Sequence, residues 1–455
     1  MNKAATAAEI GVSLSTSRKS VEKLQSSLQA KAKSERAFRF YSLWDKVFRE
    51  DVLREAYRRS RANGGAPGVD GVDFKAIEAA GLERWLQALQ EELRSKSYAP
   101  QPLLRVWIPK RNGGQRPLSI PTVKDRVVQT AVVLVLGPIF EADLAPQQYG
   151  FRPGLDAKMA VRKVYFHIAQ HGRREVVDAD LSDYFTTIPH GPLLRCVARR
   201  VTDGQVLSII KRWLTVPAWE RTSRGAIVCT TEARDRKRGT PQGGSASPLL
   251  ANLYFRRFLL AWYAHGHSRR LDAQVVNYAD DLVICCRPGN GAEALAVMRR
   301  LMERLGLTVN DRKTRLARVP EESFDFLGYT VGRFYGYNGR EFIGTEPSRK
   351  SLRRIIERIH DETTPRWNLE TAEKRVAALN ALLRGWSGYF DQGRVIRAYR
   401  VIQKYTVSRL RRWMVRRQGK RGTTGYRQYP YEYLYETLGL YKLPDSRAAV
   451  AKAKA

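Results

Sequence analysis

Two short apolar runs of the sequence carry acids that could hold metal ions. Asp180 stands near the end of the run 176–181, where a strand would bury its apolar neighbours. Asp280 and Asp281 are adjacent within a second run, 274–286, which predicts two strands joined by a tight turn. Neighbouring carboxylates at a buried hairpin tip are unfavourable unless cations balance their charge. Divalent cations bound by carboxylate oxygens serve phosphoryl transfer, so the pattern indicates that chemistry.

The same acids also admit plainer interpretations. Aspartate is a favoured turn residue, so Asp280 and Asp281 taken alone would equally suit an ordinary hairpin turn. Asp178 alternates with Asp180, which places both side chains on one face of the strand. We interpret Asp178 and the nearby Asp183 as structural or solvated residues rather than as metal ligands.

The overall charge indicates a polyanionic partner. The 455 residues include 80 Lys and Arg against 45 Asp and Glu, a formal net charge of +35. An excess of this size is expected of proteins that bind nucleic-acid phosphates. The four cysteines form no C-x-x-C pair, which favours reduced thiols over a zinc site. With no signal peptide and no run long enough to span a membrane, we expect a cytoplasmic, nucleoid-associated protein.

The periodicity of apolar residues predicts an α+β fold. Helices are expected at residues 1–36, 38–60 and 73–95. A β-hairpin at 103–120 and a buried apolar helix at 130–140 are expected to follow. The first helix is expected to be loosely attached, and the last to end at a Gly-Pro pair. The hairpin carries Lys110 and Arg116 near its predicted turn.

From about residue 345 onward the pattern predicts helices alone. One begins near Pro347 and another runs from about 394 to 417. Residues 394–421 hold eleven Lys and Arg and no acid, a density that self-repels unless phosphates are near. We therefore predict a nucleic-acid-binding surface that includes Arg353, Arg409, Arg411, Arg412, Arg416 and Arg417.

The residues 278–281, Tyr-Ala-Asp-Asp, resemble the Y-x-D-D signature of reverse transcriptases. Further motifs of that family stand in the expected order: RPLSIP at 116–121, QYGFRPG at 148–154, DLSDYF at 180–185, GTPQGG at 239–244, SPLLAN at 247–252, GLTVNDRKT at 306–314 and FLGY at 326–329. Any one of these motifs is weak evidence, whereas the ordered set is specific.

Two more motifs are similar to those of bacterial group II intron-encoded reverse transcriptases, which also act as maturases. They are GGAPGVDG at 64–71 and LRGWSGYF at 383–390. The sequence departs from that group at Thr186, where an acid is usual, and at Ser245-Ala246, near which a branched apolar residue is usual. We expect no His- and Cys-bearing nuclease domain of the kind that many members carry, because no histidine follows His360 in this sequence.

The resemblance implies a role for each matching residue. Asp180, Asp280 and Asp281 would hold two Mg²⁺ ions, for which Mn²⁺ can substitute, and the carbonyl of Leu181 would add a ligand. Nucleotide contacts would come from Lys110, Arg116 and Lys313 on phosphates, from Phe185 against a ribose 2′-hydroxyl, and from Gln242 under the nascent base pair. The alternatives are solvated charges for the basic residues and simple core packing for Phe185.

The resemblance also implies a right-hand polymerase fold. Residues 1–36 would form an N-terminal extension, and residues 37–340 the fingers and palm. Residues 345–425 would form a helical thumb or maturase domain, and residues 426–455 a C-terminal tail. The implied reaction is RNA-directed DNA synthesis from deoxynucleoside triphosphates, with an RNA template, a DNA primer and a structured group II intron RNA as partners. We expect no membrane partner, and the sequence leaves the oligomeric state open.

Three alternatives to this function remain at this point. An RNA-directed RNA polymerase also uses such carboxylates, but the ring of Phe185 argues against admission of a 2′-hydroxyl. A non-catalytic RNA-binding protein would not need the three acids. A domesticated reverse transcriptase that acts in phage defence or DNA repair would carry the same motifs.

Overall fold

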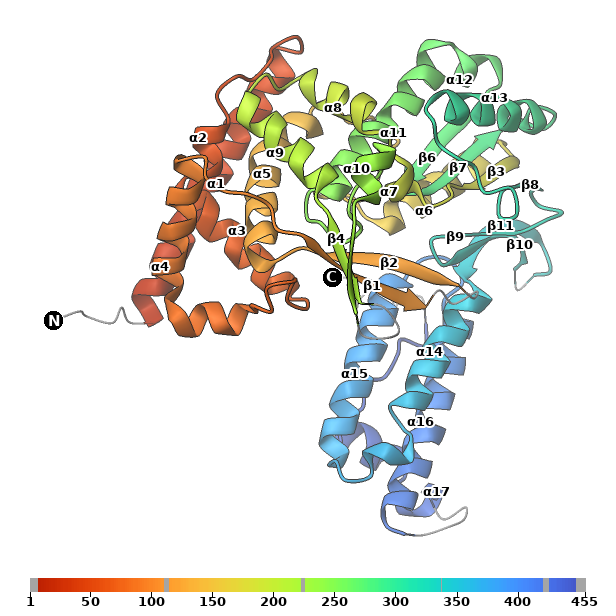
Figure 1. The fold of residues 1–455 in the computed structure, drawn as a ribbon. Coiled ribbons are helices and arrows are strands. Elements are labelled where there is room, and N and C mark those ends of the chain that lie inside the picture. Colours follow the sequence, from red (N-terminus) through yellow and green to blue (C-terminus); the bar gives the residue numbers. More distant parts are fainter. Residues whose placement is uncertain (1–6, 110–113, 222–225, 337, 420–424, 447–455) are drawn as a thin grey trace.

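The computed structural model describes residues 7–109, 114–221, 226–336, 338–419 and 425–446. Its helices in the first three quarters of the chain are α1 (Ala7–Ser34), α2 (Trp44–Val47), α3 (Glu50–Asn63), α4 (Phe74–Arg94), α5 (Val123–Glu141), α6 (Ala157–Tyr165), α7 (Tyr184–Thr187), α8 (His190–Ala198), α9 (Gly204–Thr215), α10 (Glu232–Arg236), α11 (Ser247–Ala264), α12 (His267–Arg270) and α13 (Gly291–Arg304). A π-helical turn, Phe166–Gln170, follows α6. The α+β class predicted from the sequence is confirmed (Figure 1).

Eleven strands form three sheets within the described residues. The strands are β1 (Leu103–Pro109), β2 (Gln115–Ile120), β3 (Glu175–Asp180), β4 (Ala218–Arg221), β5 (Ile227–Thr230), β6 (Gln274–Tyr278), β7 (Asp281–Cys286), β8 (Arg315–Arg318), β9 (Phe324–Phe326), β10 (Tyr329–Tyr335) and β11 (Glu341–Pro347). The sheet orders are β2-β1-β4-β5, β6-β7-β3-β8 and β11-β10-β9. The predicted hairpin is confirmed as β1–β2, and the predicted strands beside the acids are confirmed as β3, β6 and β7.

The N-terminal helix is firmly attached, which corrects the sequence-based expectation. Val21 and Leu28 of α1 are buried in the same core as the helices α3 and α5. Gln25 donates a hydrogen bond to the carbonyl of Leu134 in α5 (2.9 Å). The buried guanidinium of Arg200 binds the carbonyl of Ala32 at the end of α1 (2.7 Å). Burial of an apolar stripe therefore makes α1 part of the main core.

Two other predicted helix boundaries are wrong. The single helix expected at 38–60 is divided into α2 and α3, with Phe40 paired instead to Val201 in an isolated bridge. The helix expected to end at the Gly-Pro pair continues past Pro138 to Glu141. Buried neighbours on α5 supply the packing that offsets the hydrogen bond lost at the proline.

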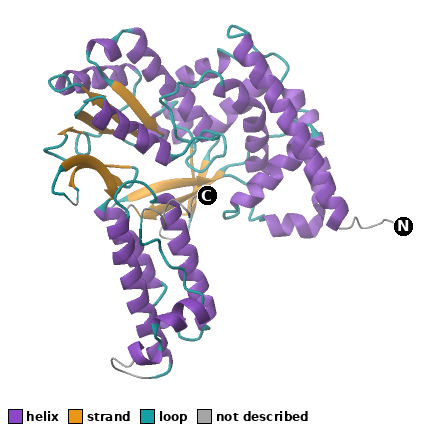
Figure 2. Cartoon of the chain, turned by 180° about the vertical axis from the view of Figure 1, so that it is seen from behind, coloured by secondary structure: helices purple, strands orange, loops and turns teal. Residues whose placement is uncertain are grey.

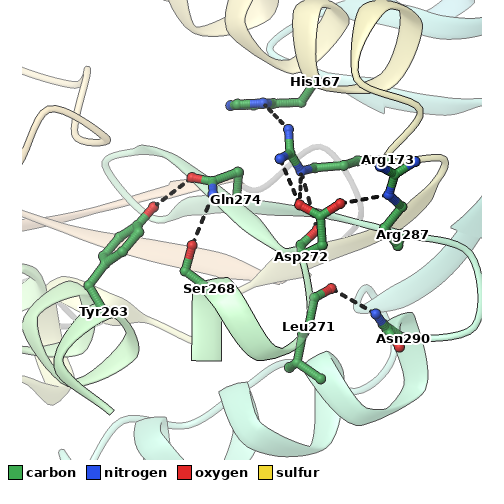
Figure 3. Close-up of polar contacts among 9 residues, drawn as sticks. All are labelled: His167, Arg173, Tyr263, Ser268, Leu271, Asp272, Gln274, Arg287 and Asn290. Carbon is green, nitrogen blue, oxygen red and sulfur yellow. Dashed lines mark hydrogen bonds and ion pairs between the residues drawn. The ribbon is translucent and has the colours of Figure 1, made fainter. Parts of the chain in front are cut away.

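The sheet β6-β7-β3-β8 is tied together at one end by a single carboxylate (Figure 3). Asp272, just before β6, accepts hydrogen bonds from Arg173 before β3 and from Arg287 after β7, each with one contact of 2.7 Å. These residues lie at the end of the sheet opposite Asp180 and Asp281. The contacts hold three strand ends together and so restrict sliding of the strands past one another.

The C-terminal part is helical and projects away from the sheets (Figure 2). It contains α14 (Arg349–Asp361), a short 3₁₀ turn (Pro365–Trp367), α15 (Ala372–Tyr389), α16 (Ile396–Arg417), α17 (Gly425–Gln428) and a π-helical turn (Tyr433–Thr437). The helices predicted near 347 and at about 394–417 are confirmed as α14 and α16. Leu434, Leu440 and Leu443 are buried in the same core as these helices, so the chain packs there up to its C-terminal described residues. None of the described helices is long and apolar enough to cross a membrane.

Candidate active site

The three predicted catalytic acids lie at one end of the sheet β6-β7-β3-β8. Strands β3 and β7 are antiparallel, and their register places Asp180 directly opposite Asp281. Strands β6 and β7 form a hairpin closed by Ala279 and Asp280, in which Ala279 has a φ of +56°. Antiparallel pairing therefore brings together acids that are a hundred positions apart in the sequence, as predicted.

The negative charges at this end are incompletely compensated. Burial, together with the neighbouring carboxylates of Asp280 and Asp180, raises the pKa of Asp281 to about 7. Burial also raises the pKa of Asp280, and the nearby cations Arg116 and Lys313 offset only part of that rise. The site thus favours the arrival of additional positive charge.

Asp180 is held by groups from the segment after α13. Lys313 forms an ion pair with the Asp180 carboxylate (Nζ to Oδ2, 3.0 Å), and the Asn310 side chain donates to the same oxygen (3.2 Å). The backbone N–H of Asn310 also donates to the Asp180 carbonyl (2.9 Å). The structure therefore brings the predicted phosphate-binding Lys313 to the acids, and it shows a positioning role for Asn310 that the sequence did not reveal.

The donor set fits a hard divalent cation, because all three side chains offer carboxylate oxygens and their charges repel one another. Among the described residues, however, no three acidic, histidine or cysteine side chains converge into a ready-made metal cage. Lys313 and Asn310 account for part of this, since they hold one oxygen of Asp180. Asp180, Asp280 and Asp281 are the side chains that would hold metal ions here.

The segment around Gly150 supports the turn that carries Asp280. The N–H of Tyr149 donates to the carbonyl of Asn277 in β6 (2.8 Å), so residues near 148 lie beside β6 as a short parallel bridge. Asn252 of α11 donates to the carbonyl of Gly150 (2.8 Å). A Cβ at position 150 would lie 2.6 Å from the backbone nitrogen of Ala279. Only glycine permits this close approach.

The predicted nucleotide contacts Arg116 and Gln242 lie together. Arg116 Nε on β2 donates to Gln242 Oε1 (2.7 Å), and the N–H of Ser119 donates to the Gln242 carbonyl (2.7 Å). Gly243 follows with a φ of +119°, and a Cβ there would lie 2.5 Å from the Ser119 carbonyl oxygen. The loop is thereby fixed to the edge of the hairpin. Lys110, predicted beside Arg116, lies outside the described residues.

Phe185 is partly buried and belongs to an aromatic group. Its ring contacts the edge of Phe151 (6.4 Å between centroids) and the ring of Tyr184 (5.8 Å). Phe151 has a φ of +57° and is 55% exposed, which is unusual for a large aromatic residue. Phe151 belongs to the motif at 148–154, where its sequence position indicates no role; its contact with Phe185 makes it a neighbour of the predicted sugar contact.

The remaining acids and Leu181 have defined surroundings. Asp178 lies 3.6 Å from Arg315 Nε, and burial raises its pKa to about 6. Asp183 is exposed at the start of α7 with a φ of +45°. Leu181 is buried and forms a bridge with Val309, while its carbonyl as a metal ligand stays a prediction.

Two of the predicted nucleic-acid contacts are corrected by the structure. Arg409 is buried and donates to the side chain of Thr363 (3.0 Å), and Arg411 is buried and donates to the carbonyl of Tyr429 (2.8 Å). Both guanidinium groups fasten the helical unit internally, because buried charges need such partners. The other four, Arg353, Arg412, Arg416 and Arg417, are exposed on α14 and α16.

We predict that Gly150→Ala lowers primer extension by about a hundredfold, because a shift of about 1 Å in reacting groups has that effect. The added methyl group would overlap the backbone at Ala279, so it must displace the turn that carries Asp280. Gly137→Ala is the control, since a Cβ there meets nothing within 4 Å. Steady-state extension rates, with thermal melting to confirm folding, measure the effect. Equal rates for both variants would show that Gly150 does not position the turn.

Comparison with known proteins identifies two regions of the chain. A family model for reverse transcriptase (RNA-dependent DNA polymerase) matches residues 108–331, and one for the group II intron, maturase-specific domain matches residues 352–429. The first region contains the three aspartates, and the second contains most of α14 together with α15 and α16.

Several proteins are similar to this chain. Protein YkfC of Escherichia coli K12 is 32% identical over 368 residues, which cover 73% of this chain and 93% of YkfC. The group II intron-encoded protein LtrA of Lactococcus lactis subsp. cremoris is 30% identical over 216 residues, 47% of this chain and 34% of LtrA. A putative COX1/OXI3 intron 1 protein of Saccharomyces cerevisiae is 24% identical, covering 62% of this chain and 38% of that protein. With both matched regions in order and the aspartates assembled at one end of a sheet, the chain belongs to the reverse transcriptase and maturase family of group II introns and is an RNA-directed DNA polymerase.

Proposed function

We propose that this chain extends a DNA primer on an RNA template with deoxynucleoside triphosphates and Mg²⁺. The observation that carries the proposal is the register that sets Asp180 opposite Asp281, beside Asp280. In nucleotidyl transfer, the primer 3′-hydroxyl attacks the α-phosphate and pyrophosphate leaves. Three carboxylates at the end of two paired strands suit a reaction whose charge develops on phosphate oxygens.

Reverse transcriptases use divalent metal ions, and we propose two Mg²⁺ ions held by Asp180, Asp280 and Asp281. Such ions neutralise phosphate charge and stabilise the negative charge on the attacking and leaving oxygens. The raised pKa of Asp281 supports this assignment, since the burial and the like charges that raise it also favour a bound cation.

The surrounding residues orient the nucleotide. Arg116 is held through Nε by Gln242 and has no other side-chain hydrogen bond among the described residues, which leaves its other guanidinium nitrogens for the triphosphate; Lys313 adds a point charge beside Asp180. Phe185 blocks a ribose 2′-hydroxyl, and its contact with Phe151 keeps the ring in place. Gln242 lies under the nascent base pair on a loop fixed to β2.

We propose that the molecule is a right hand. The sheet β2-β1-β4-β5 with the N-terminal helices forms the fingers, the sheet β6-β7-β3-β8 forms the palm, and the helices from α14 onward form the thumb. The sheet β11-β10-β9 is joined to the thumb by Tyr329 of β10 and Tyr389 of α15. The Tyr329 hydroxyl donates to the Tyr389 carbonyl (2.6 Å), and the Tyr389 hydroxyl donates to the Leu327 carbonyl (2.7 Å).

The helical unit is proposed to bind a structured intron RNA as well. Its exposed arginines on α14 and α16 supply the charge, and the match to a maturase-specific domain supports the partner. Arginine forks bind phosphates in two-point contacts, which suits a folded RNA backbone.

We predict that Asp281→Asn abolishes primer extension and yet raises the melting temperature in EDTA at mildly alkaline pH. The folded state holds the Asp281 proton more tightly than the unfolded state, so wild-type stability falls as pH rises between about 4 and 7. The side chain introduced by Asp281→Asn carries no charge, so the variant does not lose this stability as the pH rises. Added Mg²⁺ should stabilise the wild type and not the variant.

Asp180→Asn is the matched control for this prediction. It should also abolish extension, but it should not raise the melting temperature, because the Asp180 carboxylate is paired with Lys313 and Asn310. Extension by either variant would contradict the assignment of the acids. A chain that binds RNA but never extends a primer would support the non-catalytic alternative.

We predict that Phe185→Val raises ribonucleotide incorporation relative to deoxynucleotide incorporation by about tenfold or more, because the lost ring frees room for one hydroxyl. Single-turnover extension with each triphosphate measures the ratio. Phe342→Val, which alters a 39% exposed phenylalanine outside the site, is the control. An unchanged ratio in Phe185→Val would reduce Phe185 to core packing.

We predict that joint replacement of Arg412, Arg416 and Arg417 by Gln weakens binding of structured RNA and flattens its salt dependence. Each lost phosphate contact removes about 0.7 to 0.9 from the slope of log affinity against log salt. A control with Arg269, Arg300 and Arg304 replaced by Gln loses the same charge from exposed positions on α12 and α13. Equal slopes for both proteins would place the RNA contacts elsewhere.

A further inference from the structure

An arginine-lined cavity lies outside the catalytic site. It has a volume of about 300 Å³ and lies between α8 and α11, next to the end of α5. Four arginines line it: Arg195, Arg199, Arg256 and Arg257. Figure 1 shows α8 and α11 on the side of the molecule away from the helices α14–α16. The cavity shares no lining residue with the group formed by the three aspartates, Arg116, Gln242 and Lys313.

The cavity has far more positive than negative charge. Asp143 is the one acid in its lining, and its carboxylate is paired with Arg200 (Nε to Oδ2, 3.3 Å). Arg256 donates to the Asp143 carbonyl (2.5 Å), and burial lowers the pKa of Arg256, with Arg199 and Arg200 acting in the same direction. The cluster is therefore not neutralised by its own acids.

Some arginines elsewhere in the fold are paired with acids. Arg58 and Arg59 both pair with Glu55, for example, and Arg54 pairs with two glutamates. Arg195 lies on α8 and Arg199, four residues later, directly follows that helix; both are exposed and pair with no carboxylate in the described part of the chain. Like charges held this close are unfavourable unless an anion enters.

The lining indicates which kind of anion fits. Four guanidinium groups offer the two-point contacts that phosphate oxygens accept. Phe140 in the lining is only 1% exposed, so no aromatic face is open for a base to stack on. The exposed Arg195 and Arg199 continue the charge outward from the cavity. These features suit a phosphate within a strand better than a free nucleotide.

We propose that this cavity binds a backbone phosphate of a nucleic-acid strand that runs outside the catalytic site. The proposal rests on nucleic-acid binding by this polymerase, and it adds a second point of contact on the opposite side from the helical unit. A contact there would anchor a long RNA during synthesis without a part in the chemistry.

Cys196 provides a reporter of occupancy, because it lines the cavity and is partly exposed. In a Cys229→Ser background, Cys196 is the remaining accessible cysteine, since Cys285 and Cys286 are buried. A long structured RNA should slow alkylation of Cys196 by about tenfold under saturating conditions, as expected when bound phosphates close the cavity. Inorganic phosphate and a nucleoside triphosphate, added separately, form the comparison arms.

The second measurement uses the full chain with Arg195, Arg199 and Arg257 replaced by Gln. Arg256 is retained because it fastens Asp143. The variant should bind long RNA with a salt slope flatter by about 2 to 3, and RNA should no longer protect Cys196. Extension of a short primer–template should stay at the wild-type rate, which separates this proposal from that for the catalytic site. The Arg269, Arg300 and Arg304 variant is the charge-matched control.

Three results would overturn the proposal. RNA that leaves Cys196 alkylation unchanged would show that no strand enters the cavity. Protection by a free nucleoside triphosphate or phosphate but not by RNA would make it a small-anion site instead. Equal changes in the salt slope for the cavity variant and the control would assign the effect to net charge alone.

Discussion

The pairing of β3 with β7 is the constraint on which the active site depends. Side chains alternate along a strand, so a slip of one residue would send Asp180 and its neighbours to the opposite face. The strands are rich in fully buried apolar residues such as Val177 and Ile284, which oppose such a slip. The ion pairs of Asp272 with Arg173 and Arg287 tie the far ends of the same strands. Apolar burial and a distant polar clamp thus together fix the position of the carboxylates.

Segments far apart in the sequence complete the site by close backbone contact. The segment before Gly150 pairs with β6, the Gln242 loop pairs with β2, and the residues near Asn310 pair with the end of β3. Two of these contacts depend on glycine, at Gly150 and Gly243, because a side chain would overlap the neighbouring backbone. These sequence motifs are therefore needed for backbone packing as well as for chemistry. Each brings a backbone to within hydrogen-bonding distance of the element that carries an acid or a nucleotide contact.

The positive charge of the chain serves two purposes that sequence position alone does not separate. Arg200, Arg409 and Arg411 are buried and bind backbone carbonyls, so they hold elements together. The exposed arginines of α14 and α16 remain open to solvent, as do Arg195 and Arg199 in the cavity beside α8. A net charge of +35 indicates a polyanionic partner, but only burial and pairing show which cations are available to it.

The amino-acid sequence was sufficient to predict the family, the acids and most of the elements around them. Strand pattern and motif order were sufficient to predict β3, β6, β7, the hairpin β1–β2 and the α+β class, because local periodicity encodes these elements directly. It also brought Asp180, Asp280, Asp281, Arg116 and Lys313 into one site by resemblance. The attachment of α1, the division at 38–60 and the continuation of α5 past Pro138 were not predicted, because each depends on packing against distant residues.

The roles that depend on neighbouring residues became visible in the folded structure. It placed Arg409 and Arg411 inside the helical unit, although they belong to the same basic run as the exposed Arg412 and Arg416. It gave Asn310 a contact with Asp180 and grouped arginines from α8 and α11 around one cavity. Charge and burial at a given position are set by what folds against it. The residues next to a position in the sequence do not show which distant residues will pack against it.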